Sequence, residues 1–290
     1  MLRNRWVRKS MMVILVLATL VGTVLPAGAS VYASRSEWED NVLIENPLDT
    51  MTKKNEEIVS VTFLDTLEDA PKKPWNLGER GARDSVQGWI EWKYGQGHVY
   101  IAAEGGINGR NACSELFMGC ESLREVHFNG AFHTEEAESM VNMFYMCYDL
   151  EEVDLETLNT SRVTSMYQMF RECASLEEVD LSKLDTSEVE TMYCMFSTCS
   201  SLEKLDLRSF NTENVTNMGY MFSACTSLES VDVSSFDTSE VVNMEGMFRW
   251  CNDLEEYDFS SWDVSNVKKH SGFMNSGMKI NGKNWEKFFQ

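Results

Sequence analysis

The sequence lacks the residue patterns of a metal centre. No Cys-x-x-Cys pair occurs, and the four histidines are scattered along the chain at His98, His127, His133 and His270. Protein zinc sites need ligands that cluster at short spacing. We therefore expect neither a bound metal nor a cofactor.

A recognisable catalytic motif is missing as well. Residues 34–112 contain no Ser/His/Asp or Cys/His arrangement with a familiar local signature, so we expect a binding protein and not an enzyme. One alternative stays open, because aromatic residues in this stretch can line a sugar-binding site as well as form core. These residues are Trp75, Trp89, Trp92 and Tyr94.

Positive charge is scarce. The chain has 25 Lys and Arg against 46 Asp and Glu, a net charge of −21. Four of the bases lie in the first 29 residues, which hold no acid, so the remainder is more acidic still. Such a surface repels phosphate groups, which argues against nucleic acids and anionic membranes as partners. Basic peptides, cations and neutral surfaces are the expected ones.

The N-terminus has the layout of a secretory signal peptide. Its positive residues are Arg3, Arg5, Arg8 and Lys9. The uncharged apolar run that follows, residues 11–25, is shorter than the ~20 residues of a membrane-spanning helix. We expect residues 1–33 to be removed, with cleavage after Ala29 or Ala33, and no membrane span in the secreted chain. The first cysteine is Cys113, which argues against a lipid anchor.

The central part of the chain repeats every 26 residues. The motif Met-x-x-Met-Phe-x-x-Cys recurs in register and ends at Cys147, Cys173, Cys199, Cys225 and Cys251. Apolar residues at i, i+3, i+4 and i+7 line one face of a helix. A residue suited to an N-cap precedes the first Met in each copy, at Ser139, Ser165, Thr191, Asn217 and Asn243. This half of the repeat therefore predicts a short, capped helix.

The other half of the repeat alternates apolar and polar residues, for example in residues 176–184 and 202–210. Alternation of this kind predicts a short strand. The expected fold is an α/β repeat solenoid that is leucine-rich-repeat-like, with one short parallel strand and one short helix per 26-residue repeat. Stacking would bury the apolar sides of the repeats in one continuous core.

A narrower resemblance is carried by residues 236–248, FDTSEVVNMEGMF, and by residues 210–218, FNTENVTNM. Both resemble the repeat of the BspA-like leucine-rich-repeat surface proteins of bacteria. The likeness covers residues 113–277. It implies a secreted or cell-surface protein, and in some family members an adhesin for host matrix proteins.

The expected organisation has four parts. Apolar runs at residues 58–64, 86–92 and 98–102 predict strands ahead of the repeats, and five Lys with one Glu make residues 264–290 locally basic. The parts are a signal peptide (1–33), a lead-in and β-rich N-terminal cap (34–112), the repeat solenoid (113–263) and a degenerate basic C-terminal cap (264–290).

The five motif cysteines are expected to be buried free thiols. Each shares the apolar face of its predicted helix, and neighbouring helices lie about 8–10 Å apart, whereas a disulfide needs Cα atoms closer than about 7 Å. Cys194 lies at a different position in its repeat, so it is expected to be more exposed. The redox state of Cys113 and Cys120 stays open.

The predicted strands place a column of acidic residues on their outer face. The residues are Asp154, Asp180, Asp206, Asp232 and Asp258, with Glu152, Glu178 and Glu256 beside them. Stacked strands would space the column at about 4.8 Å, and Lys204 and Arg208 would relieve the repulsion around Asp206. These eight acids are the candidate partner-binding residues. The alternatives are a solvated face that prevents aggregation or a loose Ca²⁺ site, although a row of carboxylates is no closed oxygen cage.

A second column is interpreted as structural. Its residues are Asn159, Asp185, Asn211, Asp237 and Asp263, and the first four are each followed by Thr. Such residues satisfy backbone groups in turns.

The expected function follows from the acidic face. It is a secreted or cell-surface recognition and adhesion module, a monomer, which binds a host or neighbour-cell surface or matrix protein that carries a basic patch. The alternative is a structural envelope spacer or scaffold held by its basic C-terminal cap.

Overall fold

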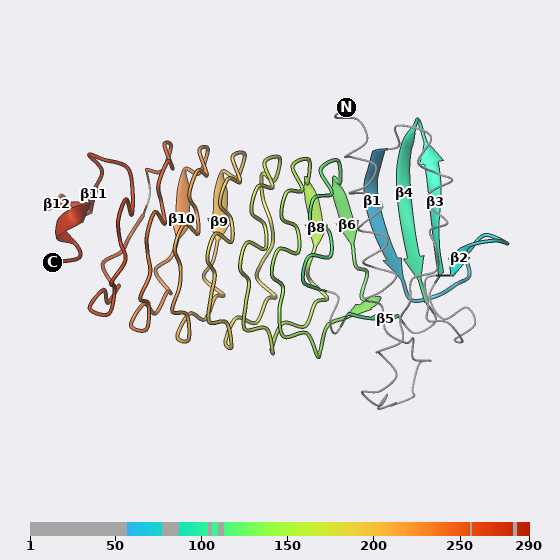
Figure 1. Cartoon of the computed structure of the whole chain (residues 1–290), viewed down its shortest axis with the longest axis horizontal. Coiled ribbons are helices and arrows are strands. Elements are labelled where there is room, and N and C mark those ends of the chain that lie inside the picture. Colours follow the sequence, from blue (N-terminus) through green and yellow to red (C-terminus); the bar gives the residue numbers. More distant parts are fainter. Residues whose placement is uncertain (1–56, 77–86, 104–105, 110–112, 256, 281–282) are drawn as a thin grey trace.

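The chain forms a row of stacked turns that starts from a β-sheet at its N-terminal end (Figure 1). This computed structural model describes residues 57–76, 87–103, 106–109, 113–255, 257–280 and 283–290. The expected signal peptide and the lead-in up to residue 56 lie outside these ranges. Within them, no helix has the length and apolar character needed to cross a membrane. We call each 26-residue unit of the stack a coil.

The N-terminal sheet has six strands in the order β2-β3-β4-β1-β6-β8. Three of them form from the expected apolar runs: β1 (Glu57–Leu64), β3 (Gln87–Lys93) and β4 (Gln96–Ala102). The others are β2 (Trp75–Asn76), β6 (Glu125–His127) and β8 (Glu152–Asp154). Because β1 pairs in parallel with both β4 and β6, the sheet continues without a break into the first coils.

The Met-containing half of each coil is not a helix, so the predicted α/β solenoid with one helix per repeat is wrong. Among the described residues, helix is limited to the 3-10 turn η3 (Trp285–Lys287). In a helix each N–H would bond within its own segment. Here alternate N–H groups bond to the next coil instead, as from Met166 to the Thr191 carbonyl at 3.0 Å and from Gln168 to the Tyr193 carbonyl at 2.9 Å.

Left-handed residues explain why the helix does not form. The second and sixth residues after the first Met have positive φ in all five copies: Asn142, Met146, Gln168, Glu172, Cys194, Thr198, Tyr220, Ala224, Gly246 and Trp250. Each of them reverses the helical winding and closes a tight turn. Apolar spacing of i, i+3, i+4 and i+7 therefore also fits consecutive turns that point the same side chains inward.

The strand half is also less regular than predicted. Three-residue strands form at β8, β9 (Lys204–Asp206) and β10 (Ser230–Asp232), and β9 pairs with β10 in parallel. Residues 178–180 form no strand. The leucine-rich-repeat interpretation is overturned by both findings, because the repeat consists of turns and short strands.

Stacking aligns identical side chains into buried columns. The clearest column consists of Phe144, Phe170, Phe196, Phe222 and Phe248, whose neighbouring ring centroids lie 5.1 to 5.9 Å apart. Both Met residues of every motif are fully buried beside them. The core expected from the repeat pattern is confirmed, although its backbone differs.

The motif cysteines are buried and unpaired, as expected. Each thiol donates to the carbonyl of a Phe in a preceding coil, as Cys225 does to Phe196 at 3.0 Å. The geometric reason given for free thiols is nevertheless wrong, because no helices separate the coils. The expectation for Cys194 is also wrong: its side chain is 6% exposed, since its left-handed backbone turns it under the surface. Cys113 and Cys120 are free thiols too.

The C-terminal residues cover the last coil. A short hairpin of β11 (Lys279–Ile280) and β12 (Lys283–Asn284) leads into η3. Ile280 and Trp285 pack against the core and are 4% and 7% exposed. A short parallel pair, β5 (Ile107–Asn108) with β7 (Phe132–His133), joins the N-terminal sheet to the first coil.

Candidate functional site

The acidic residues of the strand half lie side by side on the outer face. The parallel pairing of β9 and β10 sets Asp206 directly beside Asp232. Asp180, Asp206, Asp232 and Asp258 are exposed, while Asp154 is half-buried. Of the flanking acids, Glu152 and Glu178 are exposed, and Glu256 lies outside the described residues. The structure thus brings together the described candidate residues of the acidic column.

Each Asp of this column also has a structural role that sequence reasoning missed. Its carboxylate accepts a hydrogen bond from the backbone N–H two residues later, at 2.8 to 3.1 Å, in a turn that ends the strand segment. Serine at that position in three of the five coils is a turn signal that was available. The Asp residues of the acidic column therefore stabilise the turns of the coils as well as giving this face its negative charge.

These hydrogen bonds hold the carboxylates in their charged form. The bonds from Ser182 lower the pKa of Asp180, and those from Ser234 and Ser260 lower the pKa of Asp232 and Asp258. A hydrogen bond to the ionised form stabilises that form. The face accordingly keeps its negative charge well into the acidic range.

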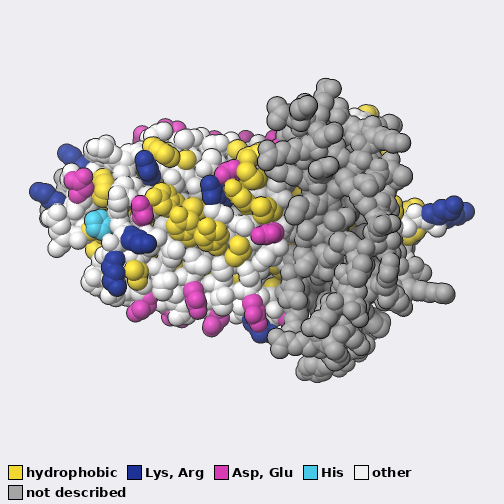
Figure 2. Space-filling view, in the orientation of Figure 1, with side chains coloured by type: hydrophobic (Ala, Val, Ile, Leu, Met, Phe, Trp, Pro, Cys, Tyr) yellow, Lys and Arg dark blue, Asp and Glu magenta, His cyan; other side chains and the backbone are white. Residues whose placement is uncertain are grey.

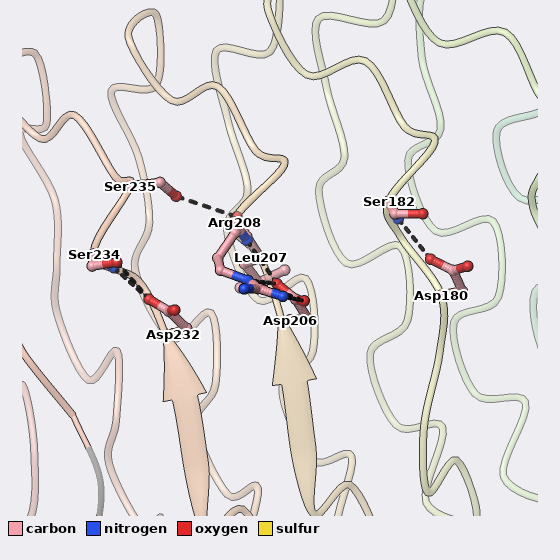
Figure 3. A network of polar contacts seen from close by, with 8 residues as sticks. All are labelled: Asp180, Ser182, Asp206, Leu207, Arg208, Asp232, Ser234 and Ser235. Carbon is pink, nitrogen blue, oxygen red and sulfur yellow. Dashed lines mark hydrogen bonds and ion pairs between the residues drawn. The ribbon is translucent and has the colours of Figure 1, made fainter.

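One member of the column is neutralised. The Arg208 guanidinium lies against Asp206, with Nη2 at 2.5 Å from Oδ2 and Nε at 2.9 Å from Oδ1 (Figure 3). This pairing lowers the pKa of Asp206 to about 2. The predicted relief of repulsion at mid-column is confirmed for Arg208.

The acidic column borders a groove of about 800 Å3 that runs across four coils. Its polar lining residues include Glu178, Lys204, Asp206, Arg208, Asp232 and Asp258. Its apolar lining residues are Val179 and Tyr257, which are partly exposed, and Leu205, Val231 and Val233, which are buried in the core. A second groove of about 750 Å3 adjoins it, lined by Glu151, Ser175, Glu177, Glu178, Ser201, Glu203 and Lys204. The groove is therefore acidic and partly apolar.

The second polar column is structural, as predicted. Its Asn and Asp side chains each accept the N–H two residues later. The buried Thr hydroxyls join the coils, and Thr186 both donates to the Asn211 carbonyl and accepts from the Asn211 N–H at 2.8 Å. These bonds satisfy backbone groups that the turns leave unpaired.

The turns carry partly exposed aromatic residues that sequence reasoning did not single out. Tyr167 and Tyr193 stack at 5.3 Å, and Tyr193 meets Tyr220 edge to face at 5.8 Å. Arg249 lies over the Trp250 ring at 4.2 Å. Figure 2 shows a band of hydrophobic side chains that runs along one face of the stack, with charged side chains at its borders.

The described part of the chain shows no cluster of metal-binding side chains. No three His, Cys, Asp or Glu side chains converge there to hold an ion. The acidic residues of the column lie in a row along the stack.

The fold and this face define a class of protein built from stacked 26-residue coils with an acidic groove on one side. The matching family model is described as "Mycoplasma protein of unknown function, DUF285" and matches residues 111–227 and 203–288. These matches cover more than half of the chain, which belongs to this family. No curated protein and no solved structure matches it.

Proposed function

We propose that this protein is a secreted or cell-surface recognition module that binds a protein partner through its acidic strand face. The partner is a surface or matrix protein of a host or neighbouring cell that carries a basic patch. The contact residues are Glu152, Asp154, Glu178, Asp180, Asp206, Asp232, Glu256 and Asp258. The observation that carries the proposal is the groove along this column, which is lined by exposed carboxylates and by the partly exposed Val179 and Tyr257.

Three further arguments support it. The sequence resembles bacterial BspA-like surface proteins, in which some members are adhesins. Repeated coils offer an extended surface of the kind that repeat proteins use for binding. Hydrogen bonds within the turns also fix the carboxylates in place, so little conformational entropy is lost when a partner binds.

The experiment compares capture of host matrix and cell-surface proteins by two triple variants. The test variant changes Asp180, Asp206 and Asp232 to Asn. Asn keeps the oxygen that accepts the turn hydrogen bond, as Asn211 already does at 3.0 Å. Charge reversal to Lys would remove that oxygen and endanger the turn, so Asn is the sharper choice.

The control variant changes Asp185, Asp237 and Asp263 to Asn. It removes the same number of charges from the structural column, where the same turn bond is kept. Exposed charge pairs contribute about 0.2–1 kcal/mol each. Loss of the Asp180 and Asp232 carboxylates, which are not paired with Arg208, therefore weakens capture by the test variant by about 2- to 30-fold. Equal capture by both variants would sink the proposal.

A second function is favoured by one observation. Lys268, Lys269, Lys279 and Lys287 are all exposed at the C-terminal end, which suits a structural spacer bound to anionic envelope polymers. Truncation after Asp263 would remove Trp285 and uncover the core, so Lys268→Glu with Lys269→Glu is the better variant. Unchanged retention on isolated cell wall would rule out these two lysines as the anchor.

A further inference from the structure

The groove on the strand face is not uniform along its length, because one position differs between coils. The residue two positions after each column Asp is Glu156, Ser182, Arg208, Ser234 and Ser260 in turn. Ser234 donates its hydroxyl to Asp232 at 2.6 Å, which leaves the carboxylate charge in place. Arg208 instead cancels the charge of Asp206 with a guanidinium that is 68% exposed.

The carboxylates on the two sides of this pair, Asp180 and Asp232, are two coils apart, and Lys183 and Arg208 act on them only by longer-range attraction. Asp206 pairs in register with Asp232, and it influences the ionisation of Asp180 from the other side. Neighbouring strands lie about 4.8 Å apart, so Asp180 and Asp232 are separated by about 10 Å. A polyproline II segment repeats its side-chain direction every three residues, which is about 9.3 Å.

We propose that the Arg208–Asp206 pair sets the binding register of the groove, which takes a polyproline-II-like peptide segment of the partner with basic side chains three residues apart. Asp180 and Asp232 lie on either side of the Arg208–Asp206 pair (Figure 3). One basic side chain of the segment meets Asp180 and the next meets Asp232. The two intervening residues cross the coil between these two carboxylates, over the Arg208–Asp206 pair. This inference rests on the proposed function, because it names the partner segment for the same face.

The two other registers with this spacing, Asp154 with Asp206 and Asp206 with Asp258, both use Asp206 and are blocked by Arg208. An Arg placed at position 234 has the same turn geometry, since Asp232 accepts the Ser234 N–H at 3.1 Å and Asp206 accepts the Arg208 N–H at 3.1 Å. Arg at this position therefore neutralises the Asp two residues before it. Arg208→Ser combined with Ser234→Arg therefore moves the neutralised carboxylate from Asp206 to Asp232 without a change of fold.

The test uses two labelled peptides of the same composition, Gly-Pro-Lys-Pro-Pro-Lys-Pro-Gly and Gly-Pro-Pro-Lys-Lys-Pro-Pro-Gly. Their affinity for the full chain is measured by fluorescence polarisation at low salt. Ser234→Arg neutralises Asp232, and Ser260→Arg, the matched control, neutralises Asp258 with the same added charge. We expect the spaced peptide to bind wild type more tightly than the adjacent one, to bind Ser234→Arg about 2–5-fold more weakly, and to bind Ser260→Arg as it binds wild type.

The double variant Arg208→Ser with Ser234→Arg has the wild-type net charge and frees the Asp206 and Asp258 pair. We expect it to regain the affinity for the spaced peptide. Equal weakening by Ser234→Arg and Ser260→Arg would overturn the register while leaving the acidic face intact as a docking surface. Failure of the spaced peptide to bind wild type at about 1 mM would overturn it as well. The proposed function fails by a separate result, the retained capture by the Asn variant of the strand face.

Discussion

Replacing Ala224 by glycine distinguishes a left-handed turn from a helix, because the free energy of unfolding should rise for the turn and fall for the helix. Ala224 has a φ of +62°, and its N–H donates to the Arg249 carbonyl of the next coil at 2.7 Å. A left-handed conformation costs a residue with a Cβ about 1–2 kcal/mol. Glycine removes that strain but adds about 0.4–1 kcal/mol of unfolded-state entropy. We expect Ala224→Gly to stabilise the chain by about 0.5–1 kcal/mol.

A helical segment would respond in the opposite direction. Ala is the best helix former and Gly costs about 1 kcal/mol in its place. The assay is equilibrium urea unfolding followed by tryptophan fluorescence, with the free energy of unfolding extrapolated to water. A destabilisation of about 1 kcal/mol would refute the left-handed turns.

Ala174→Gly is the matched control. Ala174 lies in a turn of the preceding part of the stack and has no positive φ. The same substitution is therefore expected to destabilise it by about 0.5–1 kcal/mol. Opposite signs for the two alanines cannot arise from a general effect of glycine on the unfolded chain.

Three further predictions test the columns. Thr186→Val leaves the Asn211 N–H and carbonyl without their buried partner and should lower the free energy of unfolding by about 2–4 kcal/mol. The control Thr164→Val, at an exposed threonine, should lower it by less than about 1 kcal/mol. Equal losses would contradict the role of the buried Thr hydroxyls in joining the coils. A thiol reagent should label the native chain slowly and all eight cysteines after unfolding, because burial raises the pKa of thiols such as Cys199, to about 12; fast native labelling would contradict the buried columns. The Asp206 carboxylate should titrate near pH 2 when followed by NMR. Its ion pair with Arg208 should be fully present above pH 3.8, the usual pKa of an Asp, and should be lost as the pH falls through about 2. In Arg208→Ser that midpoint should move up towards the usual 3.8, and an unchanged midpoint would argue against the pair.

Much of the inward-facing pattern was predictable from the sequence. Side chains such as Met192, Phe196 and Cys199 are fully buried, as their spacing indicated. The apolar runs at residues 58–64 and 98–102 form strands because they contain β-branched and aromatic residues in alternation. Periodicity identifies which residues share a side of the backbone, and that information survives a wrong choice of secondary structure.

The backbone of the Met-containing half was not predictable in this way. Its left-handed positions hold Gln168, Cys194, Tyr220 and Ala224, and only Gly246 carries the usual glycine signal. The strain at these residues is offset by hydrogen bonds to the next coil, which a single repeat does not reveal. A short helix and a pair of turns place Met, Met, Phe and Cys on the same side, so local spacing does not distinguish them.

The position of the acidic column was predictable from the repeat. The exposure of its carboxylates was predicted, but their hydrogen bonds to the turns were not. Exposure of Asp232 followed from alternation, but its hydrogen bond to the Ser234 N–H depends on the turn that ends the strand. The Arg208–Asp206 contact was anticipated because two residues in one coil, on the same side, lie close in any extended geometry. Residues 178–180 form no strand, which alternation alone did not indicate.

Binding of a partner on the strand face can be tested by a hydrogen-exchange footprint of the chain with its captured partner. Amides that open locally are slowed where a partner covers them. We expect slower exchange in residues 178–182, 204–208 and 230–234, with no change in the turns around Tyr167 and Tyr193. Slower exchange confined to those turns would contradict it.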